Sequence, residues 1–200
     1  MTELLFVVIA FLSGSLMFSL WVGKLALRRD IRAVGDGNPG AFNLIATSKG
    51  WGAVGALLDA FKGCIPVGIA KWVFVISGTP LALIAIAPLL GHAFSPWLRF
   101  RGGKAVAVTF GVWTGLTLWE GPTILGVLLG VWFSVVTVSG HVVMLVMGCL
   151  GAYWLLTNRD PVYLTVWVVN TLLLAYKYRA DFSKPLDLRA SFKERLWRST

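Results

Sequence analysis

Residues 91–104 read Gly-His-Ala-Phe-Ser-Pro-Trp-Leu-Arg-Phe-Arg-Gly-Gly-Lys and interrupt a long apolar sequence with three cations and two adjacent glycines. Gly102 and Gly103 can adopt positive φ and bring bare backbone close to an anion, and the amides that open the following helix would point at it. The three cations of the segment are Arg99, Arg101 and Lys104. We therefore predict a phosphate-binding loop here, with a basic anchor between two membrane helices as the alternative.

The composition is that of an integral membrane protein. Hydrophobic residues make up 57% of the 200 residues and charged residues 14%. We predict an all-α membrane protein, a single compact bundle in one domain over residues 1–200. The apolar runs place about seven transmembrane helices at 4–23, 51–76, 80–98, 104–119, 122–138, 141–156 and 161–177. The acidic start, Met1-Thr2-Glu3, lacks the basic region of a signal peptide, so the first helix is expected to be retained.

Basic charge is concentrated in three segments of the chain. All but three of the 18 Lys and Arg residues lie in residues 24–49, 99–104 and 177–200. The predicted helices put these segments on one side of the membrane, and the positive-inside rule makes that side cytoplasmic. We therefore expect a plasma-membrane protein with its N-terminus outside and its C-terminus inside. The net charge of +9 is interpreted as topology and attraction to anionic lipids, not as nucleic-acid binding.

A second unusual string occupies residues 35–43, Gly-Asp-Gly-Asn-Pro-Gly-Ala-Phe-Asn. Its proline and three glycines predict a turn-rich loop in place of a regular helix. The glycines are Gly35, Gly37 and Gly40. Backbone amides and the amides of Asn38 and Asn43 would face one small volume suited to a polar headgroup, with a plain linker as the alternative. Asp36 repels phosphate, so it would bind a cation, cap the turn or, as we favour, accept a hydrogen bond from a substrate hydroxyl.

An apolar run farther along contains a charged pair. Asp59 and Lys62 are three residues apart, so they share a helix face and can pair with each other or reach a common ligand. Charges inside a membrane are costly and usually functional, with a structural ion pair as the alternative. Lys71, later in the same predicted helix, is expected to extend to the outer interface.

Both histidines fall at predicted cytoplasmic helix ends. His92 belongs to the 91–104 segment, and His141 follows Ser139 and a glycine between the fifth and sixth predicted helices. Because histidine titrates near neutral pH, both are candidate catalytic residues, with a structural hydrogen-bonding role as the alternative. The sequence has no metal-ligand spacing, cofactor fingerprint or nucleophile elbow, so no metal or cofactor is expected.

Together these strings resemble the motifs of the bacterial acylphosphate-dependent glycerol-3-phosphate acyltransferases, the PlsY family. The matching strings are Gly-x-Gly-Asn-x-Gly-Ala-x-Asn at 35–43, Leu-Asp-x-x-Lys-Gly at 58–63, Gly-His-x-Phe with Phe-x-Gly-Gly-Lys at 91–104, and Val-Ser at 138–139. They follow the family's order and spacing over nearly the whole chain. The resemblance implies seven transmembrane helices, an external N-terminus and a cytoplasmic-side site. It also implies acyl transfer from acyl phosphate to the sn-1 hydroxyl of glycerol 3-phosphate, giving lysophosphatidic acid for phospholipid synthesis.

Several positions depart from the family's motifs. The chain has Asp36 where the family usually has Ser, Phe42 in place of Thr, Ala46 in place of Arg and Val142 in place of a second Ser. The C-terminal region that carries a His and an Asn in the family reads Tyr-Arg-Ala-Asp at 178–181. We therefore predict either a divergent enzyme with the same chemistry or a relative with another acceptor or donor.

The residues and the resemblance predict a mechanism of positioning and charge neutralisation. The donor's phosphate would lie against residues 35–43 and Lys104, and the acceptor's phosphate against Arg99, Arg101 and the glycine pair. Asp59, Lys62 and Ser139 complete the predicted substrate-binding residues. The candidates for taking the hydroxyl proton are a substrate phosphate oxygen, His92, His141 and Asp36.

Two other classes of function fit the sequence less well. A lipid-phosphate transporter or flippase needs cations facing a membrane cavity, but polar or broken helices should then cross the whole membrane, whereas the polar residues here gather at one face. A structural membrane subunit needs no charged pair beside two glycine-rich loops. The expected partners are the two substrates and the bilayer, and the oligomeric state stays open.

Overall fold

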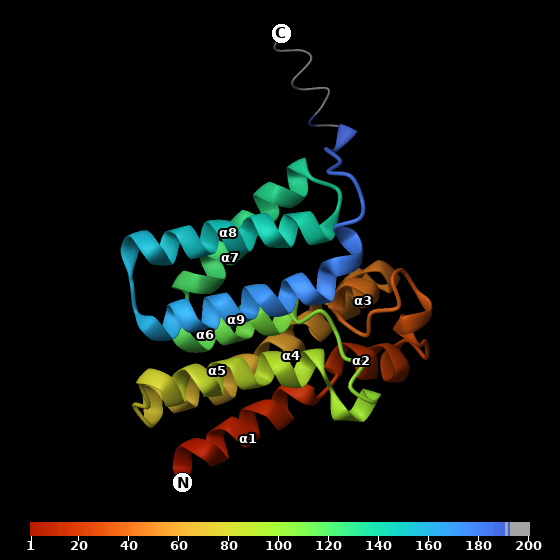
Figure 1. Cartoon of the computed structure of the whole chain (residues 1–200). Coiled ribbons are helices and arrows are strands. Elements are labelled where there is room, and N and C mark those ends of the chain that lie inside the picture. The colour runs from red at the N-terminus through yellow and green to blue at the C-terminus, as the bar shows by residue number, and fades with distance from the viewer. Residues whose placement is uncertain (191, 193–200) are drawn as a thin grey trace. The chain divides into compact units, whose positions relative to one another are not determined.

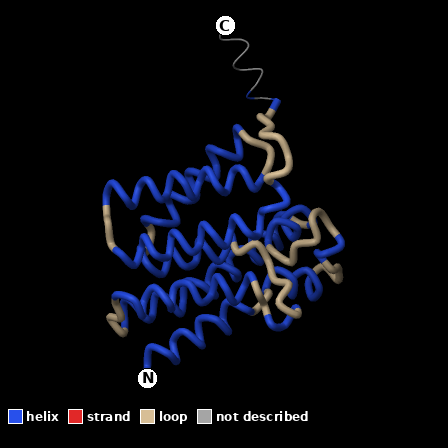
Figure 2. The backbone as a smooth tube through the Cα atoms, viewed as in Figure 1, coloured by secondary structure: helices blue, strands red, loops and turns tan. Residues whose placement is uncertain are grey.

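The secondary structure is helical throughout the part of the chain that the computed structural model describes, residues 1–190 and 192 (Figures 1 and 2). The sole β feature among these residues is an isolated bridge between Val136 and Leu188. The chain forms two compact units, one up to Pro122 and one from Thr123 onward.

The first unit contains six α-helices. They are α1 (Thr2–Ser15), α2 (Phe18–Ala26), α3 (Ala41–Thr47), α4 (Lys49–Gly68), α5 (Gly78–Ala93) and α6 (Val106–Thr117). Short helical turns cover Ile31–Ala33 and Pro96–Leu98, and α4 continues as a π-helical turn over Ile69–Val73. Lys71 in that turn donates to the Leu116 carbonyl at 2.5 Å and lies over the Trp72 ring. It therefore also caps the end of α6, beyond the interfacial role predicted for it.

Glycines let the helices of this unit approach each other closely. A Cβ on Gly14 of α1 would lie 2.3 Å from the Pro88 carbonyl oxygen of α5, and one on Gly91 would lie 2.2 Å from the Phe11 carbonyl oxygen. On α6, a Cβ on Gly111 would lie 1.8 Å from a carbonyl oxygen of α4. Close backbone packing at small residues is typical of membrane helices. Figure 1 shows α1 beside α5 in this arrangement.

The predicted first helix, residues 4–23, is wrong in one respect, because it is broken after Ser15. Leu16 adopts an extended conformation with φ −66° and ψ 133°, and helical structure resumes at Phe18. The break leaves the Leu16 carbonyl without a helical partner, and the Lys62 ammonium of α4 hydrogen-bonds to it. The interruption is thus compensated by a buried cation from another helix.

The second unit contains α8 (Ser139–Thr157), α9 (Pro161–Tyr178), a short turn over Arg179–Asp181 and most of α7 (Glu120–Val135), whose first turn belongs to the first unit. Trp167 of α9 packs on Gly151 of α8, where a Cβ would lie 2.1 Å from the indole ring. Its indole Nε1 donates to the Met147 carbonyl at 2.7 Å. These contacts hold α8 against α9.

Each of the seven apolar runs contains helix, with two helices, α1 and α2, in the first run. Four helical stretches are long and apolar enough to cross a membrane by length and composition. These are Thr2–Ala26, Lys49–Val73, Gly78–Leu98 and Ser139–Thr157, with shorter apolar helices at Val106–Thr117 and Glu120–Val135. The loop prediction for residues 35–43 holds up to Gly40, but its last three residues already belong to α3. The cations Lys193, Arg195 and Arg198 of the third basic segment lie outside the described residues.

Candidate active site

The glycine-rich loop before α3 is closed by hydrogen bonds between its own side chains and backbone. Gly35 and Gly37 have φ of 60° and 74°, a region that glycine adopts without strain. The Asp36 carboxylate accepts hydrogen bonds from the backbone amide of Asn38 and from the side-chain Nδ2 of Asn43, both at 3.1 Å. Asn43 Nδ2 also donates to the Asn38 carbonyl at 2.9 Å. The loop therefore has a defined shape with Asp36 as the acceptor at its centre.

An ion pair joins this loop to the end of the 91–104 segment. Lys104 Nζ lies 2.8 Å from Asp36 Oδ2, with 21% and 48% of the two side chains exposed. Partial burial raises the pKa of Asp36, but hydrogen bonds from Lys104, the Asn38 amide and Asn43 outweigh it and hold the pKa below its ordinary value. Asp36 is therefore ionised at neutral pH, and Lys104 supplies the compensating cation beside it.

The glycine pair differs from the prediction in its backbone. Positive φ occurs at Arg99, Phe100 and Ala105, with values of 51°, 61° and 65°, and not at Gly102 or Gly103. What requires glycine there is contact with His92: a Cβ on Gly102 would lie 1.9 Å from the His92 carbonyl oxygen, and one on Gly103 would lie 2.2 Å from Nε2 of the ring. The pair thus serves close packing against a histidine.

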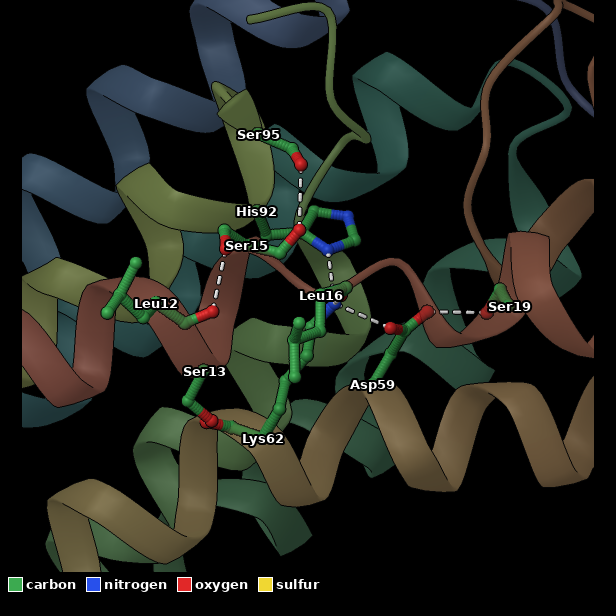
Figure 3. Close-up of polar contacts among 9 residues, drawn as sticks. All are labelled: Leu12, Ser13, Ser15, Leu16, Ser19, Asp59, Lys62, His92 and Ser95. Atoms are coloured by element: carbon green, nitrogen blue, oxygen red, sulfur yellow. Dashed lines mark hydrogen bonds and ion pairs between the residues drawn. The ribbon is translucent and has the colours of Figure 1, made fainter. Parts of the chain in front are cut away.

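The charged pair of α4 is fully buried. Lys62 Nζ lies 2.6 Å from Asp59 Oδ1, and each side chain is 1% exposed. The other carboxylate oxygen of Asp59 accepts from Ser19 of α2. Both residues do share one helix face, as predicted, and they pair with each other (Figure 3).

His92 joins this network from α5. Its Nδ1 lies 2.9 Å from Lys62 Nζ, and the residue is 3% exposed. The neighbouring Ser95 donates to the Ser15 carbonyl at 2.7 Å (Figure 3). The structure therefore joins the end of α1, the middle of α4 and the end of α5 through one set of buried polar contacts.

Arg99 and Arg101 are exposed, and the described part of the chain offers neither side chain a hydrogen bond or ion pair. The two arginines flank Phe100 and follow Trp97. Phe100 and Trp97 are each 65% exposed. Exposed cations with no protein partner are available to an anion.

Two further predicted site residues lie in the second unit. Ser139 is the first residue of α8, and the next amide, that of Gly140, donates to Asp181 Oδ2 at 3.0 Å. His141 stacks on Phe182, and its Nδ1 is buried with no hydrogen-bond partner among the described residues. Its ring contributes to an otherwise apolar groove of about 550 Å³ that also includes Met144, Leu145, Gly148, Cys149 and Leu186.

Four serines that support the site were not among the predicted site residues. They are Ser13, Ser15, Ser19 and Ser95. Ser13 donates to the Lys62 carbonyl at 2.8 Å, and Ser15 accepts from Trp97 Nε1 at 2.9 Å. The string Ser-Gly-Ser at 13–15 inside an apolar run was the available signal, because polar residues and glycine together favour a helix break. The described residues contain no group of three metal-ligating side chains.

The family model described as glycerol-3-phosphate acyltransferase matches residues 4–187. The chain belongs to this family. A glycerol-3-phosphate acyltransferase 1 from Thermotoga maritima is 35% identical over 93% of this chain and 98% of its own length. A glycerol-3-phosphate acyltransferase from Methylobacillus flagellatus is 34% identical over 94% and 95%. The resemblance seen in the motifs is therefore confirmed.

Solved structures of the family agree with this assignment. The structure of PlsY, an integral membrane glycerol 3-phosphate acyltransferase, in its glycerol 3-phosphate form matches with a TM-score of 0.83 and 26% identity over 92% of both chains. Its lysophosphatidic acid form matches with a TM-score of 0.81. With the apolar helices, these matches make the chain a multi-pass membrane protein.

The departures from the acyltransferase motifs have different surroundings. Asp36 contacts Lys104 directly. Phe42 and Ala46 lie on exposed parts of α3, whereas Val142 is fully buried in the second unit. Asp36 is therefore the departure with a direct electrostatic effect on a motif cation.

Proposed function

We propose that the chain transfers a fatty acyl group from acyl phosphate to the sn-1 hydroxyl of glycerol 3-phosphate, giving lysophosphatidic acid and inorganic phosphate. The observation that carries this proposal is the contact of Lys104 with the Asp36 loop, which brings both glycine-rich motifs of the family together. The names of the relatives and the glycerol 3-phosphate and lysophosphatidic acid forms of PlsY support the acceptor and the product.

In this proposal each phosphate has its own set of contacts. The donor's phosphate binds the amides of the Gly35–Asn43 loop and Lys104. The acceptor's phosphate binds Arg99, Arg101 and the backbone beside Gly102. Cations and oriented amides stabilise the charge that develops on the phosphate as it leaves, and they hold the hydroxyl close to the acyl carbon.

The reaction itself is an acyl transfer with phosphate as leaving group. The sn-1 oxygen attacks the acyl carbon, the bond from that carbon to the phosphate oxygen breaks, and phosphate leaves with the electron pair. Asp36 Oδ1 already accepts two hydrogen bonds and Oδ2 contacts Lys104, so one acceptor direction of Oδ2 is open to the hydroxyl. A substrate phosphate oxygen is the other proposed proton acceptor.

Replacing Asp36 tests its proposed contact with the hydroxyl. We expect Asp36→Ser to lower kcat by about ten- to a hundredfold and to change KM much less, because the lost hydrogen bond matters most as the proton leaves. Asp30→Asn is a matched control, since Asp30 is a carboxylate of the same segment whose partner is Arg32 at 2.6 Å. An unchanged kcat with a lowered KM in Asp36→Ser would limit Asp36 to closing the loop.

The proposal includes a membrane topology. The chain works as one domain of seven transmembrane helices, with the N-terminus outside and the site and C-terminus on the cytoplasmic side. The basic segments at 24–49 and 99–104 support this orientation through the positive-inside rule. The family match over residues 4–187, which runs through both units, supports a single domain.

Cysteine labelling tests this orientation. In a background without Cys64 and Cys149, we expect cysteine at position 101 to resist an impermeant maleimide in intact cells and to react after the membrane is opened. A cysteine at position 77, the exposed residue just before α5, is the matched external control. Reaction of position 101 in intact cells would contradict the orientation.

A comparison of acyl donors tests the proposed function. Purified protein is incubated with labelled glycerol 3-phosphate and with acyl phosphate, acyl-CoA or acyl carrier protein carrying the same chain. We expect labelled lysophosphatidic acid with acyl phosphate alone. Product from acyl-CoA and none from acyl phosphate would overturn the donor assignment, and labelled glycerol in place of glycerol 3-phosphate tests the need for the acceptor's phosphate.

A further inference from the structure

The buried charged pair of α4 is shielded from a substrate. An ammonium group has three protons to donate, and Lys62 Nζ has three partners: Asp59, the Leu16 carbonyl and His92 Nδ1. Asp59 in turn uses one oxygen for Lys62 and the other for Ser19. Both side chains are 1% exposed. Asp59 and Lys62 therefore have a structural role, which is to hold a neighbouring residue.

The residue that Lys62 holds in place is His92. An ammonium group only donates, so His92 Nδ1 is the acceptor, and the proton of the neutral ring is on Nε2. Lys62 thereby fixes the tautomer of the ring. It also fixes the orientation of the ring, and Figure 3 shows the His92 ring turned toward Lys62. With the ring held on one side, Nε2 faces Gly103, where a Cβ would lie 2.2 Å away.

The backbone of the glycine pair follows the surface of His92. The Gly103 amide donates to the His92 carbonyl at 3.0 Å, and a Cβ on Gly102 would collide with that same carbonyl at 1.9 Å. The next residue is Lys104, whose ammonium reaches Asp36 at 2.8 Å. A continuous series of contacts therefore runs from the helix break at Leu16 to the cation of the phosphate site.

We propose that His92 is a positioning residue that holds Gly102 and Gly103 and thereby fixes Lys104 in the phosphate site, and that Asp59 and Lys62 act through His92 without touching substrate. The expected effect on kcat/KM rests on the proposed function. The expected effect on the backbone of residues 102 and 103 rests on geometry alone. His92 is then not the acceptor of the hydroxyl proton, because its ring nitrogens face Lys62 and Gly103.

A double-mutant cycle between positions 92 and 103 tests the contact. Gly103→Ala should lower kcat/KM by about a hundredfold, because its methyl group displaces the backbone before Lys104 and small misplacements cost rates of this order. His92→Asn keeps an acceptor for Lys62 but removes the ring atoms that face Gly103, and alone it should lower kcat/KM about tenfold. In that variant, adding Gly103→Ala should cost less than threefold more. Gly50→Ala, where nothing lies within 4 Å of the added methyl group, is the matched glycine control.

Hydrogen–deuterium exchange gives a readout that does not depend on activity. We expect faster exchange over residues 101–104 in His92→Asn than in the wild type, because the ring that packs against Gly103 is lost and the hydrogen bond from the Gly103 amide to the backbone carbonyl of residue 92 opens more often. Ser95→Ala, which removes a buried hydrogen bond one turn away, should leave this exchange unchanged. If the wild type has no acyltransferase activity but His92→Asn still shows faster exchange, the proposed function fails and the structural role stands. Additive effects of the two substitutions, or unchanged exchange in His92→Asn, would overturn the role of His92.

Discussion

Lys104→Ala is expected to reduce acyl transfer by about a hundred- to a thousandfold, since it removes the one cation that contacts the glycine-rich loop in the described structure. In a partly enclosed site, the negative charge that develops on the leaving phosphate is stabilised strongly by a nearby ammonium group. The ion pair with Asp36 is partly exposed, so its loss should change the stability of the fold little. Activity and thermal unfolding measured on the same sample separate the two effects.

The control for this variant is another lysine on the same unit. Lys49 is exposed at the start of α4, with no side-chain partner among the described residues. Lys49→Ala should retain nearly full activity, and Lys104→Arg should retain more activity than Lys104→Ala because it keeps the charge. Equal losses in Lys49→Ala and Lys104→Ala, with both proteins folded, would show that Lys104 has no special role.

Asp59→Ala is expected to have the largest effect on stability, about 3–5 kcal/mol, because it leaves the Lys62 ammonium buried without its counter-ion. The double substitution Asp59→Ala with Lys62→Met should be more stable than Asp59→Ala alone, since it removes the isolated charge. It should still be less stable than the wild type, because the Leu16 carbonyl loses its donor. Unfolding of the detergent-solubilised protein by denaturant measures all three.

Asp160→Ala calibrates this comparison. Asp160 caps α9 by accepting from the Val162 amide at 2.7 Å, and loss of a cap costs about 1 kcal/mol. A cost for Asp59→Ala no larger than that of Asp160→Ala would mean that the buried pair contributes little. A double variant less stable than Asp59→Ala would show that the cost of Asp59→Ala does not come from an isolated Lys62 charge.

Much of the fold could be predicted from the sequence because helix formation in apolar segments is a local property. Each of the seven apolar runs formed helix, the first with a break after Ser15, and the proline and glycines of the first motif produced the loop that precedes α3. The pairing of Asp59 with Lys62 followed from their spacing of three residues. These features depend on neighbours in the chain.

The rest depended on contacts between distant residues. The break at Leu16 is stabilised by Lys62, and the residues near Leu16 in the sequence do not predict that contact. The need for glycine at 102 and 103 comes from His92, which lies ten residues earlier and packs against them. The glycine pair by itself predicted positive φ, which neither residue has. The ion pair of Asp36 with Lys104 is likewise a tertiary contact.

The most direct test of the proposed reaction is the stoichiometry of a single reaction mixture. Purified wild-type protein is given acyl phosphate and glycerol 3-phosphate, and lysophosphatidic acid and inorganic phosphate are measured over time by mass spectrometry and a phosphate assay, with Lys104→Ala as the blank. Acyl transfer predicts that the two products appear in equal amounts with the wild type and that both nearly vanish with Lys104→Ala. Release of phosphate without lysophosphatidic acid, or equal product formation by Lys104→Ala, would contradict the account.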